Sequence, residues 1–167
     1  IAADVIYLLP FYLPGFVDSH TGQDVRKGAL GSVYAVRDFF QIDPQLITPL
    51  QRVNWNALSK EGLCCPDDVA SLSQSARAEL LQAVGRAELR ALTRRAHALG
   101  KKVIFDLVLM QTSRDCPLID THPEFYVRDE TGRPAIHRIA WLVYSDVALF
   151  DLAFNKPLQQ YLLEVAP

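Results

Sequence analysis

The chain has 167 residues, half of them hydrophobic, and its formal net charge is −2. A chain of this length can bury the core of one globular domain, and its balanced charge offers no basic field for nucleic acid or an anionic membrane. No apolar run reaches the roughly 18 residues that span a bilayer. We therefore expect neither a nucleic-acid nor a membrane partner.

The first residues and the cysteines indicate the setting of the protein. Residues 1–4 (IAAD) lack an initiator Met and lead directly into a predicted strand, which favours a segment of a longer protein. Cys64, Cys65 and Cys116 form an odd set with a vicinal pair, which is a poor disulfide framework and lacks zinc-site spacing. We expect reduced thiols, no metal or other cofactor, and a cytoplasmic location.

The first predicted element is a buried strand of the parallel type over residues 4–9 (DVIYLL), which Pro10 ends. A long loop follows over residues 10–31, and loops of that length are usually functional or disordered. Residues 33–42 have a mixed pattern that stops before Asp43-Pro44, and residues 45–72 show no strong periodicity.

Residues 73–99 form the clearest predicted helix, because apolar side chains recur at three- and four-residue spacing. Gly85 weakens its middle, so a break is possible there, and Gly100 is well placed as the C-terminal cap. The predicted buried positions are Leu81, Val84, Leu89, Leu92, Ala96 and Leu99.

A second buried strand is predicted over residues 102–109 (KVIFDLVL), so that strand, helix and strand form a right-handed βαβ unit. Asp106 is the anomaly in this strand. An unpaired buried carboxylate is costly, so we expect Asp106 near the end of the strand, hydrogen-bonded or facing a cleft.

The remainder is predicted as another long loop over residues 112–150, followed by a helix that Asn155 caps. The buried stripe of that helix would comprise Leu158, Tyr161, Leu162 and Val165. The loop contains four acidic residues that we expect on a solvated face: Asp115, Asp120, Glu124 and Asp146.

The histidines are far apart in sequence and have no metal-ligand spacing. They are His20, His97, His122 and His137. His20 lies in the long loop after the first predicted strand, and loops of that length are usually functional or disordered. It is therefore the one histidine that we predict as a binding residue.

Five sequence stretches, in this order, resemble the alpha-amylase family, glycoside hydrolase family 13. They are residues 9–11 (LPF, at the end of the first strand), 32–44 (SVYAVRDFFQIDP), 95–108 (RAHALGKKVIFDLV), 122–125 (HPEF) and 151–157 (DLAFNKP). The resemblance implies an α/β fold, a partial (β/α)8 TIM barrel with parallel strands and long βα loops. Residues 1–167 would form part of one catalytic barrel domain and contain its second and third strands, with residues 109–150 as the excursion after the third. The two longest loops would then follow the carboxyl ends of strands, where barrel active sites lie.

Three positions carry the family's site onto this chain. Tyr34 matches a tyrosine that stacks on the sugar ring, and Asp106 matches an aspartate that orders the site. Gln111 stands where the family usually has a sugar-binding histidine, and its amide can also donate and accept hydrogen bonds. Met110 replaces an asparagine that often binds calcium, and because a thioether is a poor ligand for a hard cation, we predict no calcium there.

The resemblance implies a protein that hydrolyses or transfers α-glucosidic linkages by a retaining mechanism, acting on α-linked glucose oligosaccharides or polysaccharides. That chemistry needs two carboxylates, and no residue here matches the family's nucleophile or acid/base. We therefore expect the chain alone to be inactive and its partner to be the remainder of the barrel.

Two alternatives stay open. A catalytically inactive sugar-binding or regulatory barrel would accommodate the departures at Met110 and Gln111. A doubly wound nucleotide-binding domain would need a glycine-rich turn directly after the first strand. Pro10, Phe11 and Tyr12 occupy that place, and the glycines of residues 28–31 (GALG) lie well downstream.

Overall fold

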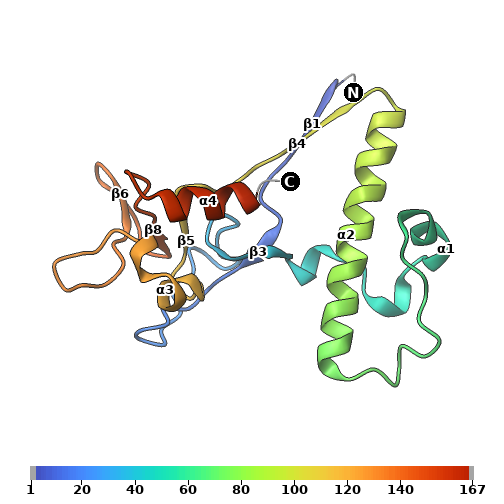
Figure 1. Ribbon diagram of the computed structural model, residues 1–167, viewed down its shortest axis with the longest axis horizontal. Coiled ribbons are helices and arrows are strands. Elements are labelled where there is room, and N and C mark those ends of the chain that lie inside the picture. The colour runs from blue at the N-terminus through green and yellow to red at the C-terminus, as the bar shows by residue number, and fades with distance from the viewer. Residues whose placement is uncertain (1–2, 166–167) are drawn as a thin grey trace. The chain divides into compact units, whose positions relative to one another are not determined.

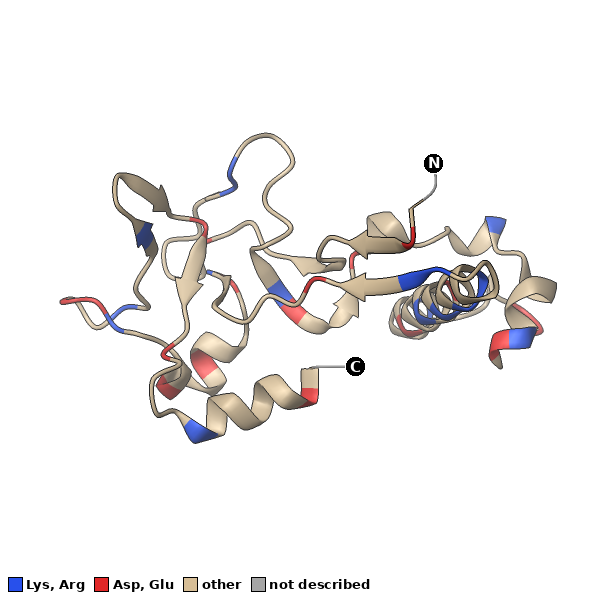
Figure 2. Cartoon of the chain, turned by 90° about the horizontal axis from the view of Figure 1, so that it is seen from above, with Lys and Arg blue, Asp and Glu red and all other residues tan. Residues whose placement is uncertain are grey.

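A computed structural model describes residues 3–165, which divide into two compact units (Figure 1). The first unit comprises the residues up to Phe11 together with Gln41–Asp106. The second comprises Tyr12–Phe40 and the residues from Leu107 onward. Both units contain Lys and Arg as well as Asp and Glu (Figure 2).

The first unit is built on a parallel strand pair joined through a long helix. Strand β1 (Val5–Leu8) pairs with β4 (Lys102–Phe105) in a register that sets Val5 opposite Lys102 and Leu8 opposite Phe105. The predicted strand–helix–strand unit is thereby confirmed. β4 ends at Phe105 rather than at residue 109, and Asp106 follows directly, donating its N–H to the Leu8 carbonyl at 3.0 Å.

The prediction that both strands are buried is wrong for alternate residues. Val5, Tyr7 and Ile104 are exposed, because two strands have two faces and residues 3–165 do not cover both. The continuous apolar runs that predicted burial on both faces are typical of strands inside a larger parallel sheet.

Helix α2 (Gln74–Ala98) crosses between the two strands without a break. Ser73 caps its start by accepting the Ala76 N–H, and Gly100 follows its end with a left-handed φ of 69°. The break that was possible at Gly85 does not occur, and the glycine instead allows close packing. A Cβ there would lie 2.7 Å from Cδ1 of Ile47.

The core of the first unit lies between α2 and the segment that showed no periodicity. That segment folds into short helical turns: η1 (Pro44–Leu46), η2 (Leu50–Arg52), α1 (Trp55–Leu58) and η3 (Ser59–Glu61). Ile47, Leu58, Val84 and Ala87 form the buried cluster. Of the predicted helix stripe, Leu92 and Leu99 are instead exposed.

Polar side chains of helix α2 also bond to the backbone of residues 42–48. The Gln82 amide bonds both to the N–H of Ile42, at 2.8 Å, and to its carbonyl, at 2.9 Å. Glu88 accepts the Thr48 N–H at 3.1 Å. These bonds satisfy backbone groups of Ile42 and Thr48.

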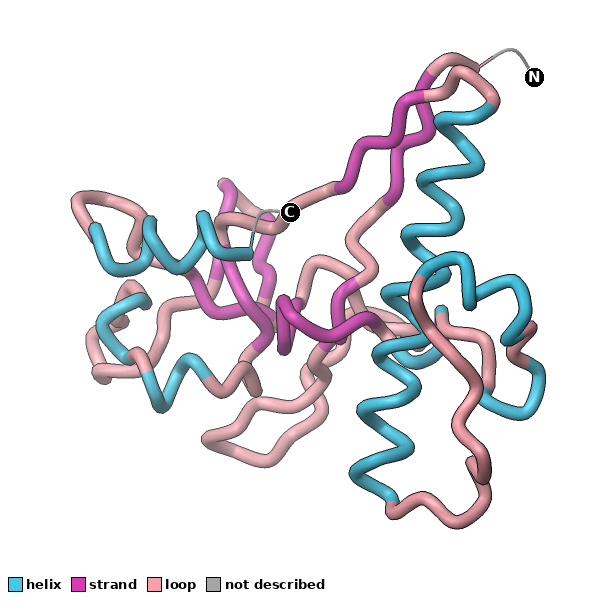
Figure 3. The backbone as a smooth tube through the Cα atoms, turned by 45° about the vertical axis from the view of Figure 1, so that its right-hand side comes forward, coloured by secondary structure: helices cyan, strands magenta, loops and turns pink. Residues whose placement is uncertain are grey.

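The second unit consists of short strand pairs joined by loops (Figure 3). Strand β2 (Tyr12–Pro14) pairs with β3 (Val36–Ile42), so the predicted loop 10–31 contains a strand. Strand β5 (Gln111–Ser113) pairs antiparallel with β8 (Val147–Leu149), and β6 (His137–Ile139) pairs antiparallel with β7 (Leu142–Tyr144).

The predicted loop over residues 112–150 is therefore largely structured. Besides these strands it includes α3 (Leu118–Thr121) and η4 (Pro123–Phe125). Elements of three or four residues are too short to establish a period of 2 or 3.6 in the sequence. Their stability comes from pairing between distant segments, which sequence periodicity does not record.

Helix α4 (Lys156–Val165) confirms the last prediction. Asn155 caps it by accepting the Leu158 N–H at 3.1 Å. Leu158, Leu162 and Val165 are buried, and the Tyr161 ring packs edge-on against Phe40 with centroids 6.1 Å apart. Within residues 3–165 no helix combines the length and apolarity needed to cross a membrane.

The packing of α4 leads to a stability prediction. Leu158 is 0% exposed and Leu163, on the same helix, is 76% exposed. We expect Leu158→Ala to lower the free energy of unfolding by roughly 2–5 kcal/mol through the lost transfer energy and the cavity. The matched Leu163→Ala change should stay within about 0.5 kcal/mol. Urea unfolding measures both, and equal losses would contradict this packing.

Candidate functional site

A chain of hydrogen bonds in the second unit joins Tyr34, Gln111 and His137. Gln111 begins β5 and is half-buried, while the next two residues of that strand are fully buried. Its Nε2 donates to the Tyr34 carbonyl at 3.4 Å, and its Oε1 lies 2.8 Å from Nδ1 of His137 on β6. Two predicted sugar-binding residues, Tyr34 and Gln111, are thus brought together across 77 residues of sequence.

The partners determine which way the Gln111 amide faces. A backbone carbonyl only accepts, so the atom that faces the Tyr34 carbonyl has to be the NH2 group. The amide oxygen then faces His137 and also only accepts. Nδ1 of His137 therefore carries the hydrogen of the 2.8 Å bond.

Aromatic packing holds the His137 ring from the other strand of the hairpin. The rings of His137 and Tyr144 lie 5.5 Å apart at 36°. Lys27 places its ammonium 3.8 Å from the centroid of the Tyr144 ring, a cation–π contact. Tyr144 lies opposite His137 in the β6–β7 register. The position of the imidazole thus depends on the hairpin as well as on Gln111.

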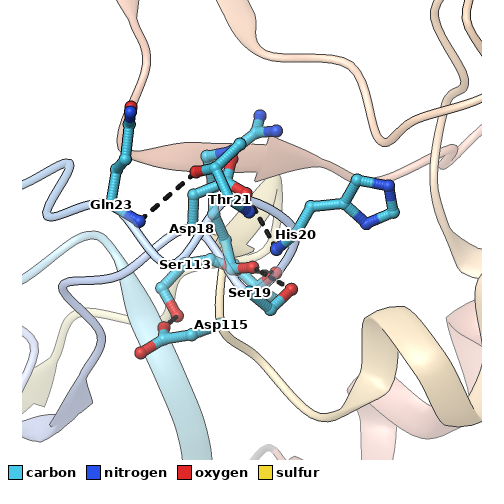
Figure 4. Close-up of polar contacts among 9 residues, drawn as sticks. Asp18, Ser19, His20, Thr21, Gln23, Ser113 and Asp115 are labelled. Carbon is cyan, nitrogen blue, oxygen red and sulfur yellow. Dashed lines mark hydrogen bonds and ion pairs between the residues drawn. The ribbon is translucent and has the colours of Figure 1, made fainter.

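A second polar centre is a buried ion pair between Asp18, in the loop after β2, and Arg114, which directly follows β5. Figure 4 shows Asp18 within its loop. One carboxylate oxygen of Asp18 accepts the N–H groups of His20 and Thr21 at 2.9 and 3.0 Å. The other accepts Nε–H of Arg114. The Arg114 carbonyl in turn accepts the hydroxyl and the N–H of Ser19.

This arrangement determines the ionisation of Asp18. Burial by itself raises the pKa of Asp18, but the hydrogen bonds from Arg114, Thr21 and His20 and the charge of Arg114 favour the carboxylate. The net result is a pKa of Asp18 below its ordinary value. Asp18 is therefore a carboxylate at neutral pH, and its charge is already balanced by Arg114.

A neighbouring carboxylate, Asp115, ties the same two segments together. It accepts the Ser113 hydroxyl at 2.6 Å and the Phe16 N–H at 3.4 Å (the Ser113–Asp115 bond is drawn in Figure 4). Gly15 is buried beside it, and a Cβ at Gly15 would lie 1.8 Å from Oδ1 of Asp115. Only glycine allows this approach.

The expectation of a solvated acidic face is therefore wrong for two of the four residues. Asp115 is partly buried and hydrogen-bonded, and Asp146 is 3% exposed. One Asp146 carboxylate oxygen has no hydrogen-bond donor among residues 3–165, which is costly for a buried charge. Asp120 and Glu124 are exposed, as expected.

The three cysteines differ in exposure. Cys64 and Cys65 are exposed, Cys116 is buried, and all three are free thiols. Burial raises the pKa of the Cys116 thiol, so it stays protonated at neutral pH. Among residues 3–165, no three His, Cys, Asp or Glu side chains are grouped to hold a metal ion.

An open pocket of about 800 Å³ lies next to the Asp18–Arg114 pair. It is lined by both members of the pair and by three further arginines, with threonine and serine hydroxyls between them: Arg128, Arg133, Arg138, Thr21, Thr131 and Ser145. His20 lines two smaller pockets beside it. Polar side chains of both signs with hydroxyls suit a hydrated, polyhydroxylated ligand.

The four predicted binding residues thus fall into three places. Tyr34 and Gln111 are joined by a hydrogen bond. His20 belongs to the Asp18 loop, where its backbone N–H caps that carboxylate. Asp106 follows β4 in the first unit. Whether any of them binds a ligand stays a prediction.

Sequence reasoning missed His137, Asp18 and Arg114. The metal-spacing criterion set His137 aside, although a contact with Gln111 across 26 residues requires no regular spacing. Asp18 and Arg114 are 96 residues apart. Each is one of several charged residues in a long loop, so no signal in the sequence singles out this pair.

Solved structures resemble this chain over almost its whole length. An alpha-amylase from Lactobacillus plantarum is 29% identical, with a TM-score of 0.60, and the match covers 97% of this chain. A noncanonic maltogenic alpha-amylase from Thermotoga neapolitana is 25% identical, with a TM-score of 0.56 and the same coverage. An alpha-amylase from H. orenii, 14% identical with a TM-score of 0.52, shares the fold.

The resemblance to the alpha-amylase family predicted from the sequence is thereby confirmed. The chain spans only 27% and 26% of the first two enzymes, so it corresponds to about a quarter of their length. No family-level sequence model and no curated protein sequence matches it.

The buried ion pair leads to a prediction with an internal control. Asp18→Asn removes the charge opposite Arg114, and we expect a loss of about 1.5–3 kcal/mol in the free energy of unfolding at pH 7. The matched change Asp24→Asn breaks an exposed pair with Arg26 and should alter stability little. Chemical denaturation of both variants measures the difference.

The same pair predicts a pH dependence. Because the pKa of Asp18 is lowered in the folded state, the carboxylate contributes fully to the free energy of unfolding above the ordinary pKa of an aspartate, at about pH 4. This contribution is lost as the pH falls through the lowered pKa. The stability difference between the natural protein and Asp18→Asn should therefore shrink in acid, and a constant difference would rule out the ionic contribution.

Proposed function

We propose that this chain is part of the catalytic (β/α)8 barrel of an enzyme that hydrolyses or transfers α-glucosidic linkages. In this proposal β1 and β4 are the second and third barrel strands, and residues 109–150 are the excursion after the third. The remainder of the barrel would pair with the free edges of β1 and β4 and cover exposed strand residues such as Tyr7 and Ile104.

The observation that carries the proposal is the likeness to two alpha-amylases at 29% and 25% identity over 97% of the chain. The hydrogen bond from Gln111 to the main-chain carbonyl of Tyr34 supports it, because it brings together a residue with an aromatic ring and a residue with an amide, which are two groups that suit a sugar. The ring covers the C–H face of a pyranose, and the amide bonds its hydroxyls. Tyr34 is 40% exposed, so its ring is accessible to a ligand.

The chemistry would follow the retaining route, in which one carboxylate attacks the anomeric carbon and a second protonates the leaving oxygen. Asp18 and Asp115 are unsuited to either role because Arg114, Ser113 and backbone N–H groups already occupy their oxygens. We propose that the remainder of the protein supplies both carboxylates. Tyr34, Asp106, Gln111 and His20 would bind and orient the sugar.

The decisive experiment uses the full-length protein with maltopentaose. Proton NMR follows the anomer that is first released, and the proposal predicts cleavage or transfer with retention of the α configuration. Binding without turnover would favour the alternative of a catalytically inactive sugar-binding barrel. A protein that neither binds nor cleaves maltopentaose would contradict the assignment to α-linked glucose substrates.

A substitution at Tyr34 tests the site itself. Tyr34→Ala removes the stacking ring, and we expect kcat/KM on maltopentaose to fall about tenfold or more, equivalent to roughly 1.4 kcal/mol. Tyr34→Phe keeps the ring and should retain most activity. Phe154→Ala truncates an aromatic side chain that is 99% exposed and serves as the control. Equal effects of Tyr34→Ala and Phe154→Ala would remove Tyr34 from the site.

A further inference from the structure

Gln111 and His137 together offer a ligand one donor and one acceptor. Gln111 uses one Nε2 hydrogen on the Tyr34 carbonyl and its Oε1 on His137. Its second Nε2 hydrogen has no acceptor within residues 3–165. The amide therefore retains one donor whose direction is fixed by two existing bonds.

The state of the imidazole follows from the same bonds. Nδ1 of His137 carries the hydrogen that is donated to Gln111, so in the neutral ring Nε2 carries a lone pair. Nε2 makes no hydrogen bond within the described part of the chain. His137 is half-buried, and its ring packs against Tyr144. Nε2 is then the acceptor of the ring that remains unused.

We propose that His137 is a ligand-contacting residue that, with Gln111, recognises a pair of adjacent hydroxyl groups on the bound sugar. Nε2 of His137 accepts a hydrogen from one hydroxyl, and the second Nε2 hydrogen of Gln111 is donated to the oxygen of its neighbour. A vicinal diol of glucose provides this combination of donor and acceptor. The identity of the ligand rests on the proposed function, whereas the tautomer of His137 does not.

The β6–β7 hairpin holds the imidazole of His137 beside Gln111. His137 and Tyr144 face each other in the β6–β7 register, and Lys27 lies over the ring of Tyr144. The imidazole thus has a packed face, a bonded Nδ1 and an unused Nε2. A histidine held only by Gln111 could rotate, but one packed against Tyr144 keeps its acceptor in place.

Two substitutions of His137 separate direct contact from positioning. His137→Ala removes both ring nitrogens. His137→Asn places an amide NH2 near the position of Nδ1, so it can keep the bond to Gln111, but it has nothing at the position of Nε2. We expect both variants of the full-length protein to bind maltotriose about 3- to 10-fold more weakly by calorimetry, the loss of one hydrogen bond.

The control is His97→Ala, an exposed histidine near the end of α2, which should leave the Kd for maltotriose unchanged. Wild-type affinity in His137→Asn would show that His137 only positions Gln111 and would overturn the direct contact. Wild-type affinity in His137→Ala would overturn the role of His137 altogether. The thermal midpoint of each variant identifies any loss that comes from misfolding.

A measurement without ligand tests the tautomer separately. In protein labelled with ¹⁵N-histidine, the signals of His137 are those missing from His137→Ala. We expect Nδ1 to be protonated and Nε2 to show the shift of an unprotonated nitrogen. The opposite tautomer would overturn the inference whatever the protein binds. The expected tautomer without maltotriose binding would instead reject the glucose ligand, and the proposed function with it.

Discussion

The ion pair between Asp18 and Arg114 is the constraint on which the second unit depends. It joins two segments that are 96 residues apart, the loop after β2 and the residues that follow β5. Because both side chains are largely buried, leaving either one unpaired would cost far more than an exposed charge would. Asp115 repeats the same link with Phe16 and Ser113, next to the glycine that allows close approach.

That double link fixes the end of β5, and the strand leads back from there to Gln111 at its start. Thr112 and Ser113 are fully buried, so the strand has little freedom, and Gln111 emerges at its edge beside Tyr34 and His137. The site is therefore preorganised by bonds that precede any ligand. Preorganised hydrogen-bonding groups bind more tightly because less conformational freedom is lost on association.

The likeness to alpha-amylases gives this geometry a chemical context. The matched regions account for about a quarter of each enzyme, and the carboxylates of Asp18 and Asp115 are already bonded to other residues of this chain. The proposed function assigns sugar-binding side chains to this chain and both catalytic carboxylates to the remainder of the protein. Sugar recognition and bond cleavage would then be supplied by different parts of one polypeptide. This division agrees with barrel enzymes, which assemble their sites from several βα loops.

The sequence by itself indicated the strands β1 and β4, the long helix α2 and the capped helix α4, because the strands are continuous apolar runs and the helices have a periodic pattern and a local cap. Its family resemblance also pointed to Tyr34 and Gln111. The sequence did not predict elements whose stability comes from contacts between distant segments. The short strands of residues 111–149 carry no detectable period, and Gly85 indicated a helix break only because its contact with Ile47 was unknown. Only the tertiary structure decided that Asp18 bonds to Arg114 and that His137 bonds to Gln111. A hydrogen bond between distant segments forms only when packing brings the two segments together, and the local sequence does not encode that packing.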